Sequence, residues 1–423
     1  ASHTRALVLK PDYPEAHNNL GSALNELGRL EEAEASFTQA IVLKPDYAEA
    51  HGNLGMALQA LGRLDEAEVR YEQAIGLKTD YAVVYNNLST ILQNQGRLEE
   101  ALTRYNEAIE LKVDYAQAYS NKNLCLNYFS NTTSLFIYQQ HLEFEKQFGG
   151  LKIRVPLMAK VNKSSGERLR IGYVSGDFRT HSVAYFFEPL LQHHNANVVE
   201  TFCYYNHKTV DDVTNRLMIF AEHWRPIVDI SDANVVDLII ADKIDILVDL
   251  SGHTADNRLL VFAQKPAPIL VTWLGSPNTT GLSAIDYRFT DVIADPIGET
   301  EQFNSETLFR LPNGFHCYGG NEIACVNAEL PHQNRGHITF GSFNNISKLT
   351  PEVIKVWSKI LNAVPQSQLL LKTSLVTNNL SHYVQLFKQE GISEDRIEYQ
   401  GHLPSNHEHL ELYGAIDIGL DPF

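Results

Sequence analysis

Hydrophobic and small residues recur with a period of 34 residues over the first third of the chain. The segments LKPDY, LKPDY, LKTDY and LKVDY repeat at that interval and end in Tyr13, Tyr47, Tyr81 and Tyr115. Within each repeat, apolar residues return at helical spacing, and a Gly-Arg-Leu segment separates two helices. The pattern predicts a solenoid of stacked helix pairs over residues 1–130, with three complete repeats and partial ones at both ends.

This pattern resembles the tetratricopeptide repeat at every signature position except the tryptophan, where His17 stands. In such a solenoid the first helix of each pair lines a concave face. An asparagine recurs on that helix, at Asn19, Asn53, Asn87 and Asn121. An amide donates and accepts, so these side chains are suited either to hydrogen bonds between helices or to binding the main chain of a peptide. The sequence leaves both interpretations open.

The period is lost after the repeats. Residues 131–166 predict a linker, with a helix at 135–147 and then the polar stretch KVNKSSGE. From residue 167 onward, hydrophobic runs that end in polar loops alternate with helical patterns, which indicates α/β layers around mostly parallel sheets. We expect two such domains, at 167–330 and 331–423.

Composition narrows the function classes. The 423 residues carry a formal charge of −17, which argues against nucleic acid and anionic membranes as main partners. No apolar run approaches the roughly 20 residues of a membrane span, and no signal peptide is visible. The four cysteines lack metal-ligand spacing and we expect no disulfides, so a cytoplasmic location is predicted, or a nucleocytoplasmic one in a eukaryote.

Polar residues gather where the predicted strands end, which is where ligands bind in parallel sheets. These candidates are Asp177, His181, His253, Asn257, Asn278, Thr279, Thr280, Asn344, Asn345 and Lys348. Dinucleotide, P-loop and serine-hydrolase motifs are absent, as is an Asp-x-Asp pair of the kind that holds a metal-bound diphosphate. The sequence FGSFNNISKLTPE places Lys348 between a strand and a helix start, where an ammonium group and free backbone amides both favour phosphate.

Several segments, taken in order, resemble the SPINDLY / O-GlcNAc transferase family, glycosyltransferase family 41, and its SPINDLY-like bacterial branch. They are GYVSGDFRTHSVAYF, DLSGHTADNRL, KPAPILVTWLGSPNTTGL, DYRFTD and TFGSFNNISKLTP. The resemblance implies an α + α/β chain in which a tetratricopeptide superhelix precedes a GT-B pair of Rossmann-like domains. It also implies inverting transfer of a sugar from UDP-GlcNAc, or alternatively GDP-fucose, to Ser or Thr of intracellular proteins, with no metal or other cofactor.

The family likeness assigns roles to single residues. Lys348 matches a lysine that contacts the donor diphosphate, and Asn345 stands where animal enzymes have a glutamine. His181 matches a histidine beside the reacting sugar and the acceptor, and His409 matches one near the nucleotide. The likeness implies that a glycine-rich loop with threonines, part of the diphosphate site, would follow Phe423, so we expect the second α/β domain to be incomplete and this chain alone to be inactive.

Other roles stay open. Asp177 is a candidate proton acceptor alongside His181, or a cap of the next helix. His253 and Asn257 are expected either to shape a sugar or acceptor pocket or to stabilise a loop, and residues 278–280 form a turn whose side chains are candidate ligand donors. The repeats are expected to bind acceptor proteins. A non-catalytic scaffold is the alternative function, and the sequence does not fix the oligomeric state.

Overall fold

The computed structural model describes residues 7–151, 154, 166–320, 329–373, 380–401, 403 and 405–422. Contacts within the chain divide it into two compact units. Unit 1 comprises Ala1–Val113, Asn127–Ser130 and Glu322–Phe423, and unit 2 comprises Asp114–Leu126 and Asn131–Asn321. The predicted linker sequence KVNKSSGE lies mostly outside the described residues, as does Cys325.

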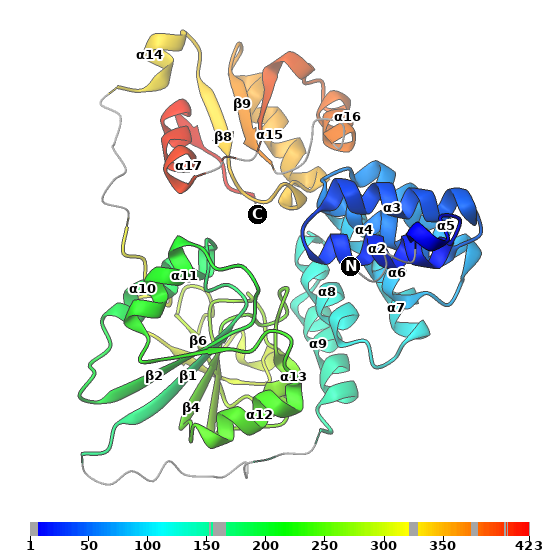
Figure 1. Ribbon diagram of the computed structural model, residues 1–423. Coiled ribbons are helices and arrows are strands. Elements are labelled where there is room, and N and C mark those ends of the chain that lie inside the picture. Colours follow the sequence, from blue (N-terminus) through cyan, green and yellow to red (C-terminus); the bar gives the residue numbers. More distant parts are fainter. Residues whose placement is uncertain are drawn as a thin grey trace. The chain divides into compact units, whose positions relative to one another are not determined.

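The repeat segment of unit 1 is built from helix pairs, as predicted (Figure 1). They are α2 (Pro14–Glu26), α3 (Leu30–Leu43), α4 (Ala48–Ala60), α5 (Leu64–Leu77), α6 (Ala82–Asn94) and α7 (Leu98–Leu111). The turn inside each pair needs a left-handed residue, which Gly28, Gly62 and Gly96 supply with φ of 72°, 75° and 79°.

Small residues let the two helices of a repeat approach closely. A Cβ atom added at Gly21 would lie 2.6 Å from the ring of Phe37, and one added at Gly55 would lie 2.5 Å from the ring of Tyr71. Both rings are fully buried, so the glycines make room for the largest apolar side chains of each repeat.

Ion pairs connect successive repeats through the Gly-Arg-Leu arginines. Arg63 donates to Glu34 of the preceding repeat at 2.7 Å, and Arg97 donates to Glu68 at 2.6 Å. Each arginine also contacts the glutamate three residues ahead, as Arg63 does with Glu66 at 2.6 Å. The repeated arginine therefore fixes both the start of its own helix and the stacking of neighbouring repeats.

Unit 2 contains a seven-stranded parallel sheet in the order β3-β2-β1-β4-β5-β6-β7. The strands are β1 (Leu169–Ser175), β2 (Val199–Tyr205), β3 (His223–Pro226), β4 (Ile246–Asp249), β5 (Ile269–Thr272), β6 (Tyr287–Thr290) and β7 (Thr307–Arg310). The strands expected from the hydrophobic runs are confirmed, whereas β3, β6 and β7 were not predicted.

The helices of unit 2 bury apolar side chains against this sheet. They are α10 (Ser182–Gln192), α11 (Asp212–Phe220), α12 (Asp232–Ala241) and α13 (Leu259–Phe262). Phe178, Phe187 and Leu217 belong to the resulting core together with strand residues such as Tyr173 and Val248. Helices α8 (Ala116–Cys125) and α9 (Ser134–Phe148) belong to the same unit, and α9 confirms the helix predicted at 135–147.

Unit 1 also contains a four-stranded parallel sheet in the order β10-β9-β8-β11. Its strands are β8 (Thr339–Ser342), β9 (Gln368–Lys372), β10 (Ile397–Gln400) and β11 (Ile418–Gly419). The helices are α14 (Pro331–Arg335), α15 (Pro351–Ala363), α16 (Ser381–Gln389) and α17 (Asn406–Leu412), and a short 3-10 turn, η3 (Ile346–Lys348), precedes α15.

Strand order reverses beside the first strand of each sheet. In unit 2, β1 lies between β2 and β4, and in unit 1, β8 lies between β9 and β11. Loops leaving the carboxyl ends of such neighbouring strands run to opposite faces, which leaves a crevice where doubly wound sheets bind ligands. The structure confirms the predicted two Rossmann-like sheets and identifies β1/β4 and β8/β11 as the places to look for sites.

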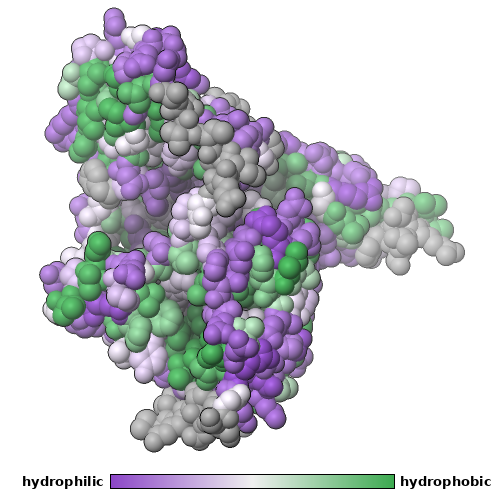
Figure 2. Space-filling view, turned by 90° about the vertical axis from the view of Figure 1, so that its left-hand side faces the viewer, coloured by the Kyte–Doolittle hydropathy of each residue, from purple (hydrophilic) through white to green (hydrophobic). Residues whose placement is uncertain are grey.

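On the face in Figure 2, the hydrophobic side chains of the described residues lie in patches among hydrophilic ones. Among the described helices, none has both the length and the apolar character that a membrane crossing requires. Three of the four cysteines are described, and none of the three forms a disulfide: Cys125 and Cys203 are buried and Cys317 is exposed.

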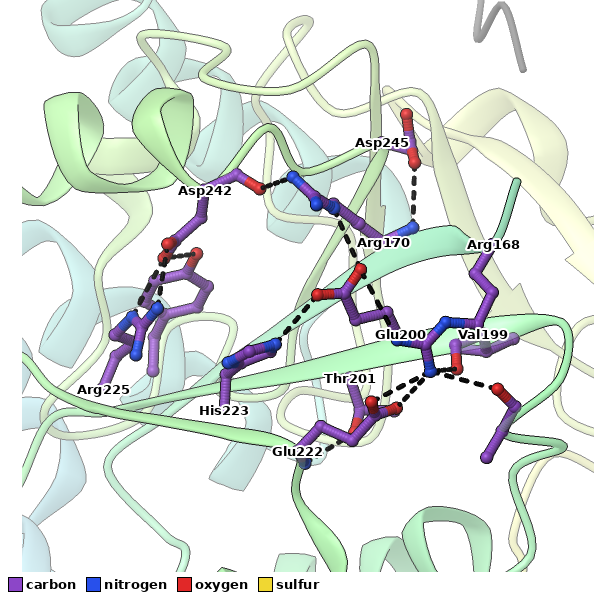
Figure 3. Close-up of polar contacts among 12 residues, drawn as sticks. Arg168, Arg170, Val199, Glu200, Thr201, Glu222, His223, Arg225, Asp242 and Asp245 are labelled. Carbon is purple, nitrogen blue, oxygen red and sulfur yellow. Dashed lines mark hydrogen bonds and ion pairs between the residues drawn. The ribbon is translucent and has the colours of Figure 1, made fainter. Parts of the chain in front are cut away.

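The amino end of the unit 2 sheet is held by a charged network (Figure 3). Arg170 of β1 lies directly opposite Glu200 of β2 and donates to its carboxylate at 3.0 Å. The ring of His223, the first residue of β3, donates to the other oxygen of Glu200 at 2.9 Å. Arg168 pairs with Glu222 at 2.9 Å. The charges balance one another at the end of the sheet away from the candidate site, so we assign this network a structural role.

We expect Glu200→Gln to lower the free energy of unfolding by about 1–3 kcal/mol, because it weakens charge-assisted hydrogen bonds from two strands. Burial opposes but does not outweigh the hydrogen bonds from His223 and Arg170, so the pKa of Glu200 is lowered in the folded protein. Its stabilising contribution is therefore complete above the pKa of an unfolded glutamate, about 4.3, and is lost as the pH falls through the lower folded value. Urea unfolding at pH 7 and at lower pH measures both effects.

The matched control is Glu299→Gln, an exposed glutamate of the same unit, which should stay within about 0.5 kcal/mol of the parent. Equal losses in the two variants would contradict the structural role of Glu200.

Candidate functional site

Asp177 lies on the loop that follows β1 at the strand reversal of unit 2. Its side chain is 9% exposed, and its backbone N–H donates to the hydroxyl of Ser175 at 2.9 Å. Burial raises the pKa of its carboxyl, and the nearby His181 and Arg179 offset part of that rise. A carboxylate with a raised pKa is a better proton acceptor than an exposed aspartate.

His181 begins α10. Its Nδ1 accepts the backbone N–H of Val183 at 3.3 Å, and the same nitrogen lies 3.5 Å from a carboxylate oxygen of Asp177. Burial lowers the pKa of the imidazole, which Asp177 partly offsets. The helix cap is therefore His181 itself, and the alternative that Asp177 caps this helix is wrong. The ring side chain remains 38% exposed, so its other nitrogen is available to a ligand.

Asp249 organises the neighbouring loop after β4. It is fully buried and accepts the backbone N–H groups of Ser251 and Gly252 at 3.1 and 2.8 Å, and the hydroxyl of Thr272 at 2.8 Å. Burial raises the pKa of its carboxyl to about 6. These partners of the carboxyl all lie inside unit 2, so Asp249 shapes the loop that carries His253 and Asn257.

His253 points into the interior of unit 2. It is 1% exposed, its Nδ1 contacts the hydroxyl of Ser120 at 3.0 Å, and its Nε2 donates to the carbonyl of Thr280 at 2.8 Å. Burial lowers its pKa to about 3, so the ring is neutral at pH 7. Both ring nitrogens therefore have hydrogen-bond partners inside unit 2. This agrees with the loop-stabilising alternative for His253 and not with a position that lines an open pocket.

Asn257 and the 278–280 turn are held by local hydrogen bonds. Asn257 donates to the carbonyl of Thr254 at 2.8 Å and accepts the N–H of Leu259 at 3.2 Å. The hydroxyls of Thr279 and Thr280 both donate to the buried carboxylate of Glu306, Thr279 at 2.5 Å. The turn is thus built around Glu306, while Asn278 is half-buried beside it.

Unit 1 places the second group of predicted residues at the end of β8. Asn344 donates to the carboxylate of Asp421, which follows β11, at 2.7 Å, and this bond crosses the strand reversal. The exposed ammonium of Lys348 donates to the amide oxygen of Asn344 at 3.2 Å. Asn345 caps η3 by accepting the N–H of Ser347 at 3.0 Å, so its amide has a local structural contact. Pro351 is the first residue of α15.

His409 lies beside a lysine that the sequence did not single out. Lys372, the last residue of β9, donates from its ammonium to Nδ1 of His409 at 2.8 Å. Burial and the charge of Lys372 both lower the pKa of His409, and burial also lowers the pKa of Lys372. The rings of Phe343 and Tyr413 lie 4.7 Å apart, and each contacts the ring of His409. This edge of unit 1 therefore combines cationic and aromatic side chains.

The structure groups the predicted residues by strand end. Asp177 contacts His181 in unit 2, and Asn344 contacts Lys348 in unit 1. Sequence reasoning missed Lys372, Phe343 and Tyr413, although a single cation closing the apolar run QLLLK was a usable signal for the first. The carboxylate of Asp421 orients Asn344 and through it Lys348.

The asparagines of the repeats have different surroundings. Asn19 is exposed, and Asn53 donates to the side chain of Asn18 in the preceding repeat at 2.9 Å. Asn87 accepts from Asn86 at 3.4 Å, and Asn121 lies on α8 of unit 2. The hydrogen bond at Asn53 agrees with the interhelical interpretation for that position, and binding of a peptide by the series stays a prediction.

We expect Lys372→Met to raise the pKa of His409 toward its ordinary value of about 6.5. The substitution removes a neighbouring positive charge and a hydrogen bond to Nδ1, both of which favour the neutral ring, whereas burial continues to hold the pKa down. NMR titration of the ring measures the change. Lys388→Met, on the exposed end of α16, is the control and should leave the His409 titration unaltered; equal shifts would contradict the contact.

Comparisons with known proteins agree with this architecture. The model of glycosyl transferase family 41 matches residues 152–323, and a tetratricopeptide-repeat model matches residues 12–80 and 46–114. The O-GlcNAc transferase mutant of Thermobaculum terrenum superposes with a TM-score of 0.89 at 31% identity, covering 97% of this chain and 78% of that one.

Curated relatives match about two thirds of the chain or more. A Solanum lycopersicum protein described as a probable UDP-N-acetylglucosamine–peptide N-acetylglucosaminyltransferase SPINDLY is 40% identical over 307 residues, which are 71% of this chain and 33% of that one. An Arabidopsis thaliana protein described as the probable transferase SEC is 32% identical over 290 residues, or 65% of this chain and 29% of its own. The chain thus spans about a third of the length of the curated relatives it matches. Taken with the repeats and the two parallel sheets, these matches show that the chain belongs to glycosyltransferase family 41, the SPINDLY / O-GlcNAc transferase family.

Proposed function

We propose that the full-length protein containing this chain transfers a sugar from a nucleotide-sugar donor to serine or threonine hydroxyls of proteins. The observation that carries the proposal is the ammonium of Lys348, held by Asn344 and Asp421 across the strand reversal of unit 1. This is the edge at which doubly wound sheets bind phosphorylated ligands. The names of the similar proteins, which describe peptide N-acetylglucosaminyltransferases, support the same reaction class.

The donor half of the reaction is assigned to unit 1. During transfer the bond between the anomeric carbon and the diphosphate oxygen breaks, and the departing diphosphate keeps the electron pair. A fixed cation aimed at that oxygen stabilises the transition state more than the ground state. Lys348 is suited to this role because Asn344 limits its freedom, and Lys372 supplies a second cation at the end of the neighbouring strand. The rings of Phe343 and Tyr413 offer apolar surface for a planar base.

The acceptor half is assigned to the loop of Asp177 and His181 in unit 2. The acceptor hydroxyl oxygen bonds to the anomeric carbon while its proton passes to a base. Because Nδ1 of His181 accepts the N–H of Val183, the proton of a neutral ring lies on Nε2, which then donates to the acceptor oxygen. In that tautomer Asp177 is the proton acceptor. A ring flip or the other tautomer would give the role to His181, so both residues remain candidates.

The repeats are proposed to present acceptor proteins. Their exposed and half-buried asparagines supply amides that bind a main chain regardless of the side chains it carries. GlcNAc from UDP-GlcNAc is the proposed sugar, and fucose from GDP-fucose is the alternative that the SPINDLY likeness raises.

Lys348→Met in the full-length protein should lower kcat about 100-fold or more, the usual effect of removing one transition-state donor. The side chain is exposed, so circular dichroism and thermal unfolding should match the parent. Lys359→Met, at an exposed position on α15, is the matched control and should retain activity. Unchanged transfer by Lys348→Met would remove this lysine from the mechanism.

A side-by-side assay with UDP-GlcNAc and GDP-fucose tests the donor. The full-length protein is incubated with each donor and a serine- and threonine-containing peptide library, and mass spectrometry identifies the sugar that is added. We expect GlcNAc on hydroxyl side chains. Fucose in its place would establish the alternative donor, and modification by neither donor would favour a non-catalytic scaffold.

A further inference from the structure

A polar pocket of about 270 Å³ opens within unit 2, next to the loop of Asp177. We call it the α8 pocket. It is lined by Ala116, Gln117 and Asn121 of the first part of α8, and by the loop from Thr254 to Arg258 after β4. Asn206, Asp232 and Leu260 complete it. It thus lies at the strand reversal between β1 and β4, where a ligand is expected.

Close contacts connect this pocket to the candidate acceptor site. The N–H of Asn206 donates to the carbonyl of Ser175, the last residue of β1, at 2.9 Å. The amide of Asn206 donates to the carbonyl of Asp256 at 2.8 Å. A Cβ atom at Gly176 would lie 2.7 Å from that of Asp256, so only glycine allows this approach. The charge of Asp256 also contributes to the raised pKa of Asp177.

The pocket carries one unbalanced negative charge. Asp232 is neutralised by Arg258 at 2.7 Å, and the same arginine donates to Asn206 at 2.9 Å. The exposed carboxylate of Asp256 has no cationic partner within the described part of the chain. The remaining polar lining is uncharged. An anionic nucleotide sugar is therefore disfavoured here, whereas a cation gains an ion pair.

The volume of the pocket limits the size of the cationic group that fits in it. At about 270 Å³ it is slightly smaller than the roughly 300–1,000 Å³ of sites for drug-sized ligands. A single long side chain fits this volume, and amides such as those of Gln117 and Asn257 suit the adjoining peptide bonds.

We propose that the α8 pocket is an acceptor subsite that binds a lysine or arginine side chain of the polypeptide being modified, with Asp256 as its counter-ion. The proposal rests on the proposed transferase function. The subsite selects acceptors that carry a positive charge at a fixed distance from the hydroxyl that receives the sugar.

The test uses peptides with one central serine in an alanine–glycine background and a single lysine moved through each flanking position. With the full-length protein, kcat/KM for transfer should be about two- to fivefold higher for lysine at one particular offset than for norleucine there, the size expected of an exposed ion pair. Asp256→Asn should abolish the lysine preference, and Asp256→Lys should replace it with a preference for glutamate. Asparagine tolerates the left-handed backbone of position 256, where φ is 55°.

The control is Asp229→Asn, which changes another left-handed aspartate of unit 2, at φ 63°, outside the pocket. It should keep the lysine preference. Fluorescence anisotropy with the same labelled peptides reports binding without transfer, so a charge preference that depends on Asp256 supports the subsite even if no sugar is transferred. Peptide binding or transfer with a lysine preference that survives Asp256→Asn, or with no preference at any offset, would overturn the proposal.

Discussion

The reversal of strand order in each parallel sheet is the constraint on which both candidate sites depend. Parallel strands direct all their carboxyl ends to one edge, and the reversal sends the loops at β1/β4 and β8/β11 to opposite faces. The residues that follow these strands therefore line the crevice that opens between the loops. In unit 1 the hydrogen bond between Asn344 and Asp421 spans the reversal and gives Lys348 a fixed acceptor. In unit 2 the bonds of Asn206 join the ends of β1 and β2 to the loop after β4.

Buried carboxylates provide the rigidity that these loops require. Asp249 holds two backbone N–H groups and a threonine hydroxyl, and Glu306 holds the turn of Thr279 and Thr280. A buried carboxylate is stable only when such donors surround it, so each one fixes several atoms at once. The polar residues near the site thus divide into those that build the loops and those left exposed for a ligand. Asp249, Glu306 and His253 belong to the first group, and Lys348 and Asp256 to the second.

The sequence predicted the architecture well where apolar residues recur at a regular spacing or form continuous runs. The 34-residue repeat, the strands with continuous apolar runs and the amphipathic α15 appear as expected. The strands β3, β6 and β7 were missed because each has four residues and includes an arginine, as Arg288 of β6, whose charge is neutralised by Asp295 at 3.1 Å. Within the site, sequence could place His181 and His253 equally after strand ends. It could not show that one ring is exposed and the other sealed under α8 and α9, since burial by a distant segment leaves no local pattern.

The edges proposed to bind the donor and the acceptor differ in the charges of their side chains. The edge of unit 1 carries Lys348 and Lys372 together with Asp421. The edge of unit 2 carries Asp177, which pairs with Arg179, and the exposed Asp256, while Arg258 is neutralised by Asp232. The excess of positive charge at the first edge favours the proposed anionic donor, and the exposed Asp256 at the second favours the proposed cationic acceptor segment. The same carboxylates favour the transfer of a proton away from the acceptor hydroxyl, because burial and the charge of Asp256 both strengthen Asp177 as a base. A lysine bound at Asp256 would cancel the second of these contributions, whereas burial would continue to hold the pKa of Asp177 up.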